Sequence, residues 1–256
     1  MSLAWREQVE IFGLILVRVL ATLAALPIFG DRRIPMTTRI GLAAIIAGLL
    51  LPVVRIGQAE APAHLIALAV LVTKEVAVGL IIGFVSLLIF QAMQYGGQIV
   101  GFQMGFAIVN VIDPQSQQQV SLIGEMQYLM AALLFLVLNG HHMLLAAMAR
   151  SFELVPPFSV SPAPEMFGGL VGMTGEIFVI GVKIAAPAMA ALLLTNVALS
   201  IVARTVPQMN IFIVGFPIGI AVGLAALAFS TPLVAHIFRG VVSQLERDLV
   251  AILQWL

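Results

Sequence analysis

The chain has 256 residues, of which 61% are hydrophobic and 9% carry a charge. A soluble domain of ordinary composition has about 25% charged residues, so this composition predicts an integral membrane protein. Twelve basic and twelve acidic residues cancel, which argues against electrostatic binding of nucleic acid. The sequence contains no cysteine, and this excludes disulfides, thiolate metal sites and cysteine nucleophiles.

Six apolar segments follow one another along the chain, each close to the roughly 20 residues that cross a bilayer. They run approximately over 10–29, 40–56, 64–95, 125–149, 171–203 and 210–238. We therefore expect an all-α fold built from membrane-type helical hairpins. The first segment has no clear cleavage site and is expected to belong to the mature protein. Residues 239–256 place apolar side chains on one helical face and charges on the other, which predicts an amphipathic tail helix.

Basic residues outside the apolar segments do not decide an orientation, because one side would carry five and the other four. Two explanations stay open at this point. The near-balance is statistical noise, or the segments pack into a larger protein assembly instead of crossing lipid independently.

The most unusual stretch is polar and rich in glutamine. Eight of the fourteen glutamines lie between Gln91 and Gln119, with one charge, Asp113, and long apolar runs on both sides. Lipid offers such a segment no hydrogen-bond partners, so it must be buried in protein or line a water-filled path. A polar, glycine-rich and nearly uncharged segment at that depth is typical of a pore constriction.

Two sets of glycines recur at every fourth position, a spacing that lets a neighbouring helix approach closely. They are Gly97, Gly101 and Gly105 in one set, and Gly215, Gly219 and Gly223 in the other. For the second set, packing within the same chain is the stronger interpretation. The first set shares its side of the helix with Gln91, Gln94 and Gln98, which favours an inter-subunit or pore face. We treat all six as candidates for inter-subunit packing.

Five ionisable residues interrupt the apolar segments, where a charge is costly unless it has a partner. They are Arg18, Lys74, Glu75, Glu176 and Lys183. Glu176 and Lys183 are two helical turns apart on one face, whereas Lys74 and Glu75 point about 100° apart. The only nearby candidate partner for Arg18 is Glu10. A proton or ion relay is conceivable, but we favour buried charges that pair across helix or subunit contacts.

No enzyme motif is present. Adjacent histidines on a helix diverge, and no acidic residue lies within one turn of His141 and His142, so we expect no metal site there. The zinc-protease, nucleophile-elbow and phosphate-loop motifs are absent. We expect no catalysis and no cofactor.

One ordered set of residues carries a resemblance along the whole chain. It begins with Arg18, Pro27, Gly30, Pro35 and Arg39, continues through 96–106, Asp113-Pro114 and 139–142, and ends with Arg204, Pro207, Gln208, Asn210, Phe212, Gly215, Pro217 and Gly219. In this set the chain resembles the FliR family, the flagellar members of the type III secretion export-gate proteins. Relatives in virulence systems share the architecture.

The resemblance implies a single-copy subunit of the flagellar protein-export channel, in the bacterial inner membrane at the basal body. Expected partners are FliP and FliQ in the same gate, FlhB and FlhA beside it, unfolded flagellar export substrates and membrane lipid. Residues 1–165 are expected to look like FliP, and 166–256 like a FliQ helical hairpin with the amphipathic tail, so that one chain closes a helical ring. If some of the apolar segments lie outside the lipid and pack on sister subunits, this would account for the nearly equal numbers of basic residues on the two sides.

The resemblance also implies a plug loop at about 106–122 that crosses the closed channel. Its apolar side chains would seal the lumen by excluding water, and its polar ones would bond to neighbouring loops. Asp113-Pro114 favours a turn. The expected plug residues are Phe106, Ile108, Val109, Asn110, Ile112, Asp113, Pro114, Gln115, Gln117, Gln118 and Gln119. The alternative is a small-solute or ion transporter, but that predicts two similar halves, and the sequence has no convincing internal repeat.

Overall fold

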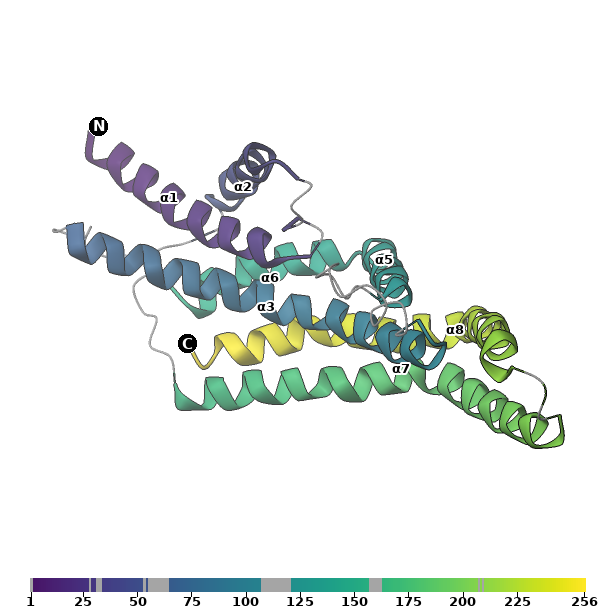
Figure 1. Cartoon of the computed structure of the whole chain (residues 1–256). Helices are drawn as coiled ribbons and strands as arrows, with labels where there is room; N and C mark the ends of the chain where they lie inside the picture. The colour runs from purple at the N-terminus through teal and green to yellow at the C-terminus, as the bar shows by residue number, and fades with distance from the viewer. Residues whose placement is uncertain are drawn as a thin grey trace. The chain divides into compact units, whose positions relative to one another are not determined.

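The computed structural model describes residues 2–27, 29–30, 34–52, 54, 65–106, 121–156, 163–206, 208 and 210–256, without the side chains of residues 2–7, 211 and 212. Every regular element in these ranges is a helix (Figure 1). In chain order the helices are α1 (Ser2–Ala25), α2 (Met36–Leu50), α3 (Leu65–Gln103), α5 (Leu122–Val137), α6 (Gly140–Leu154), α7 (Pro164–Thr205) and α8 (Ile211–Leu253). The expected all-α, membrane-type fold is confirmed.

Four of these helices are long and apolar enough to cross a membrane. They are the part Gln8–Ala25 of α1, all of α3 and α7, and Ile213–Leu253 of α8; the bent pair α5 and α6 would make a fifth. The helices α3, α7 and α8 have 39, 42 and 43 residues. At 1.5 Å per residue each is about 60 Å long, roughly twice the hydrocarbon thickness of a bilayer.

The structure refines the expected segments at three places. The segment predicted at 40–56 is the 15-residue helix α2, which is too short to span a bilayer. The segment predicted at 125–149 is divided between α5 and α6, which meet at an angle of 71°. The predicted tail helix is not separate, because it continues 210–238 within α8.

The bend between α5 and α6 has a local cause. Leu138 ends α5, and Asn139 adopts a left-handed backbone conformation with φ of 57° just before α6 begins. Among residues other than glycine, asparagine tolerates this conformation best. A helix cannot continue through it, so the chain turns at this residue and α6 begins directly after it.

The chain folds into two compact units, and α3, α7 and α8 each contribute to both. Unit 1 comprises residues 1–88, 139–174 and 242–256, and unit 2 comprises residues 89–138 and 175–241. In unit 1, α1 packs against α2, and the apolar face of the tail is buried through Val242, Leu245 and Leu249. The FliP-like and FliQ-like division near residue 165 concerns likeness to other proteins and stays a prediction.

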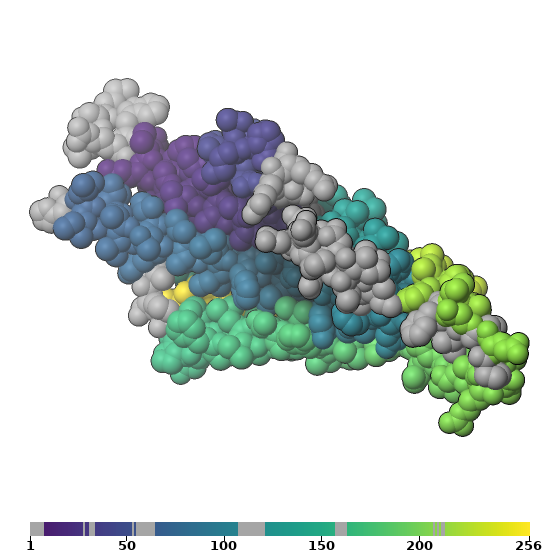
Figure 2. All heavy atoms as spheres, viewed as in Figure 1, coloured from purple at the N-terminus to yellow at the C-terminus, as the bar shows by residue number. Residues whose placement is uncertain are grey.

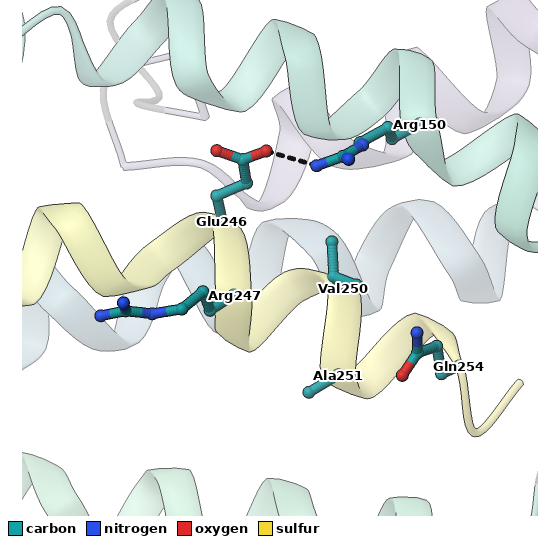
Figure 3. A pocket seen from close by; sticks show the side chains of 6 residues that line it. All are labelled: Arg150, Glu246, Arg247, Val250, Ala251 and Gln254. Carbon is teal, nitrogen blue, oxygen red and sulfur yellow. Dashed lines mark hydrogen bonds and ion pairs between the residues drawn. The ribbon is translucent and has the colours of Figure 1, made fainter.

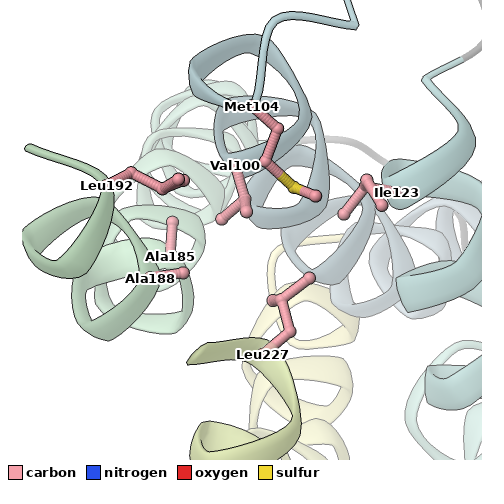
Figure 4. Close-up of a cluster of buried hydrophobic side chains, with 7 residues drawn as sticks. All are labelled: Val100, Met104, Ile123, Ala185, Ala188, Leu192 and Leu227. Carbon is pink, nitrogen blue, oxygen red and sulfur yellow. The ribbon is translucent and has the colours of Figure 1, made fainter. Parts of the chain in front are cut away.

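The core of unit 2 is formed where four helices meet (Figure 4). Its buried members come from α3 and the residue directly after it, and from α5, α7 and α8: Val100, Met104, Ile123, Ala185, Ala188, Leu192 and Leu227. Two alanines on α7 let that helix lie close to α3, and the flexible thioether of Met104 fills the space that remains. This cluster anchors the end of α3 that leads into the predicted plug segment.

Candidate functional site

Most of the predicted plug segment lies outside the described residues. Of 106–122, the structure describes Phe106, Ser121 and Leu122. The other predicted plug residues, from Ile108 to Gln119, therefore keep their predicted role without a structural account. The structure does describe the residues on either side of this segment, at the end of α3 and the start of α5.

The last turns of α3 and the start of α5 are in close contact. A Cβ added at Gly97 would lie 2.7 Å from the carbonyl oxygen of Ile123 and 2.8 Å from Cα of Gly124. Real side chains do not approach backbone so closely, so only glycine fits at this crossing. Ser121 caps α5, with its Oγ accepting from the Gly124 amide at 3.2 Å. The described backbone before and after 107–120 is thus held together.

All six glycines of the two sets contact other residues of this same chain. A Cβ at Gly101 would lie 2.7 Å from Oγ of Ser121, and one at Gly223 would lie 2.6 Å from the side chain of Met104. Gly105 has φ of 91°, which favours glycine, and it packs against the ring of Phe216. Gly215 and Gly219 are in ordinary contact, with nearest atoms 3.6 and 3.7 Å from an added Cβ. An inter-subunit role for any of the six stays a prediction.

Two glutamine side chains lie at the same crossing, since Cγ of Gln98 would be 3.0 Å from a Cβ added at Gly124 and Cγ of Gln127 2.8 Å from one added at Gly97. Gln91 and Gln94 of α3 are half-buried and Gln98 is exposed. From α5, Gln127 is 2% exposed, and its Oε1 has no hydrogen-bond partner in the part of the chain that the structure describes. Sequence reasoning missed Gln127, because it lies outside the glutamine-rich stretch and inside an apolar run.

A second polar site lies in unit 1, around the fully buried side chain of Arg18. Its Nε donates to Oε2 of Glu75 at 2.6 Å, and its Nη2 donates to Oε1 at 3.1 Å. Its Nη1 also donates to the carbonyl and the hydroxyl of Ser151, at 2.9 and 3.1 Å, and Nη2 donates to the carbonyl of Val155 at 3.0 Å. The guanidinium lies 4.0 Å from the centre of the Phe152 ring. We call these five residues the Arg18 cluster.

The Arg18 cluster joins α1, α3 and the C-terminal end of α6. The planar guanidinium suits this position, because its fork of donors can serve a carboxylate and carbonyls together while its face stacks on a ring. A helix ends with carbonyls that have no partner within the helix, and Arg18 supplies donors there. In this arrangement the Glu75 carboxylate and the Ser151 hydroxyl are both engaged in hydrogen bonds, which holds the buried charges in place.

The five predicted buried charges have different outcomes. Arg18 and Glu75 are buried and paired, but the partner suggested for Arg18, Glu10, is wrong. Lys74 is half-buried and forms no ion pair among the described residues. Glu176 and Lys183 are exposed on α7 within this chain, and their expected pairing across a helix or subunit contact stays a prediction.

The two adjacent histidines also differ from expectation. Their ring centres lie 4.2 Å apart with an interplanar angle of 51°, so the rings lie against each other instead of diverging. Within the described ranges, no three histidine, aspartate or glutamate side chains come together in a way that would hold a metal ion. The absence of a metal stays a prediction.

A shallow pocket lies between α6 and the tail of α8 (Figure 3). Arg150 and Glu246 form an ion pair of 2.6 Å at its rim, with side chains 57% and 41% exposed. Figure 3 shows Arg247 directed away from this pair. Arg150 and Glu246 pair with each other at the rim, and we assign no function to this pocket.

Comparison with known proteins identifies the family. A family model described as "Bacterial export proteins, family 1" matches residues 9–245. The chain belongs to this family of bacterial export proteins. With four helices able to cross a membrane, this export-family member is a multi-pass membrane protein.

Several curated proteins to which the chain is similar are named flagellar biosynthetic protein FliR. The relative in Bacillus subtilis (strain 168) is 36% identical, over 94% of this chain and 95% of its own length. The relative in Pectobacterium carotovorum is 31% identical, over 88% and 87%, and that in Escherichia coli (strain K12) is 29% identical, over 93% and 92%. The resemblance to FliR is thereby confirmed.

Proposed function

We propose that this member of the bacterial export family is a structural and gating subunit of the flagellar type III protein-export channel, and that it catalyses no reaction. The observation that carries the proposal is the match of the export-protein family over residues 9–245. Relatives that cover almost the whole chain are named flagellar biosynthetic proteins.

In this proposal one copy of the chain joins FliP and FliQ to close a helical ring, with FlhB and FlhA alongside, in the inner membrane at the basal body. Unfolded flagellar subunits pass through the channel. The exposed apolar surface supports such an assembly, since only 28% of the apolar window of α7 and 22% of that of α8 are buried within the chain. Helices about 60 Å long also exceed what lipid alone would cover.

The segment 106–122 is proposed as the plug of the closed channel. Its composition supports this role, because a mainly apolar run at 106–112, suited to excluding water, is followed by glutamines at 115–119 that could bond to neighbouring loops. The glycine contact between α3 and α5 supports it as well, since a segment that starts and ends at one fixed place can close a pore without the helices moving.

A deletion tests the plug. Removing 108–119 keeps Phe106, the Ser121 cap and the glycine contact, so we expect the channel complex to assemble in normal amount while the membrane becomes leaky to ions and small solutes. Leakage is measured by sensitivity to a solute that intact membranes exclude, with Arg150→Met as a control that leaves the membrane tight. An assembled complex in a tight membrane would contradict the plug role.

Purification with natural partners tests the wider proposal. We expect the chain to co-purify with other export subunits and to restore swimming in a flagellated bacterium that lacks its own relative. A stand-alone oligomer that binds a small ligand, and that restores no swimming, would favour the transporter alternative.

A further inference from the structure

The buried side of α5, in unit 2, carries a glutamine among apolar residues. Ile123, Ala131 and Phe135 are buried on this side at intervals of four or eight residues, and Gln127 lies at the same spacing between them. The other side of the helix is exposed, for example at Leu129, and Figure 2 shows side chains of α5, in teal, at the surface. An apolar residue would be expected at position 127, because only 2% of Gln127 is exposed.

The amide of Gln127 is buried against α3 at a place that offers its oxygen no donor. Its Oε1 has no hydrogen-bond partner among the residues that the structure describes. Its Cγ would lie 2.8 Å from a Cβ added at Gly97, so the two helices leave no room there for a methyl group or for a water molecule. The backbone oxygens at this crossing belong to Gln94 and Ile123, and a carbonyl oxygen accepts hydrogen bonds but cannot donate one.

A buried acceptor without a donor raises the free energy of the arrangement that buries it. The group has lost its hydrogen bonds to water and has gained none in return. This penalty is relieved in any arrangement that brings water to Oε1. Because Gln127 lies directly on α3, such an arrangement requires α3 and α5 to separate near Gly97. The glutamine therefore opposes the close contact that the glycines allow.

We propose that Gln127 weakens the contact between α3 and α5, so that α5 can move away from α3 and admit water to the crossing. Buried polar groups without partners are rare in folded proteins, and they are found where a structure stores strain for a conformational change. In its link to the channel this inference rests on the proposed function. There it names the contact between helices that gives way when the channel opens.

Replacing the amide by an apolar side chain of similar length tests the role of Gln127 in the purified full chain. Gln127→Met should raise the melting temperature by about 2–8 °C, because the unpaired acceptor is removed while a side chain still fills the site. Backbone amides of 124–131 should exchange with deuterium about tenfold more slowly, since exchange measures local opening. The matched control is Gln98→Met, which changes an exposed amide at the same crossing and should leave both measurements unchanged.

A second variant, Gln127→Leu, guards against a poor fit of the longer methionine side chain. The same rise in melting temperature and the same slower exchange are expected. If both variants melt at a lower temperature or exchange faster, Oε1 has a partner such as a bound water, and the inference is overturned. Unchanged values in both variants would overturn it as well.

The link to the channel is tested in a flagellated bacterium whose own relative is replaced by this chain. With Gln127→Met, export of flagellar subunits should be several times slower than with the unchanged chain, while equal amounts of both accumulate in the membrane. Slower deuterium exchange with undiminished export would overturn the link between this crossing and opening. If the unchanged chain restores no export, the proposed function fails, whereas the melting temperatures and exchange rates still decide whether Gln127 weakens the contact.

Discussion

At the scale of single residues, Arg18 explains how an apolar chain accommodates a charge. The guanidinium is fully buried, and each of its nitrogens has at least one acceptor, from α3, from α6 or from both. Taking a charge out of water is costly unless its partners are well placed, and here the partners come from three helices at once. The side chain therefore marks a point at which α1, α3 and α6 must all be in place.

We predict that Arg18→Met lowers the free energy of unfolding of the purified protein by about 3–5 kcal/mol, because it leaves the Glu75 carboxylate buried without a partner. Arg18→Lys should recover only part of this, since an ammonium cannot serve the carboxylate and the carbonyls in one plane. Thermal unfolding in detergent measures both variants.

The matched control is Arg150→Met. This change breaks an exposed ion pair, for which we expect about 0–1 kcal/mol. If Arg18→Met and Arg150→Met lower the melting temperature equally, the Arg18 cluster does not stabilise unit 1 as described.

At the scale of helices, close backbone contacts and turns determine where the helices cross and where they end, and hydropathy does not reveal either. The crossing of α3 and α5 depends on Gly97 and Gly124, which leave almost no space between the two backbones. The turn between α5 and α6 depends on one left-handed residue, Asn139. Neither the close approach at Gly97 nor the backbone angle at Asn139 can be read from average hydropathy.

We predict that Gly97→Ala destabilises the chain by about 1–3 kcal/mol, because its methyl group would overlap the carbonyl of Ile123 and force α3 and α5 apart. The control is Gly41→Ala in α2, where an added Cβ meets nothing within 4 Å. That variant should be neutral or stabilise by up to about 1 kcal/mol through helix propensity. A destabilised Gly41→Ala together with an unaffected Gly97→Ala would contradict the contact.

The turn at Asn139 gives a prediction of its own. Asn139→Gly should be tolerated, because glycine adopts positive φ without steric cost. Asn139→Val should destabilise the chain by about 1–3 kcal/mol, because a β-branched side chain strains that conformation. The melting temperatures of the two variants test this prediction. Equal melting temperatures for Asn139→Gly and Asn139→Val would argue against a left-handed residue at this position.

At the scale of the whole molecule, the chain leaves much of its apolar surface uncovered. The long helices α7 and α8 bury less than a third of their apolar windows within the chain. Surface of this kind is covered by lipid, by other subunits or by both. Glu176 and Lys183 within it favour protein over lipid for one face of α7.

We therefore predict that the chain, produced without the other export subunits, is degraded several times faster than in their presence. The physical reason is that its outer faces, with unpaired charges, are then open to lipid and proteases. A pulse-chase measurement of its half-life in membranes, with and without the partner genes, gives the answer. Equal half-lives would indicate a self-sufficient protein.

The sequence by itself determined the features that depend on composition and local periodicity. These are the all-α membrane class, the buried side of the tail through Val242, Leu245 and Leu249, and the membership in the export family. Each follows from side chains counted within a few helical turns, or from residues matched one by one along the chain. The plug role of 106–122 also stems from sequence and awaits its experiment.

Only the tertiary structure showed which buried charges pair with each other and where the helices end or continue. Arg18 pairs with Glu75, 57 residues away, and not with the nearby Glu10. The segment at 125–149 bends at Asn139, and the tail fuses with α8. Periodicity describes one helix at a time, whereas an ion pair between helices depends on which faces meet after folding. A single backbone angle leaves no trace in hydropathy, so these features became visible only once the helices were packed.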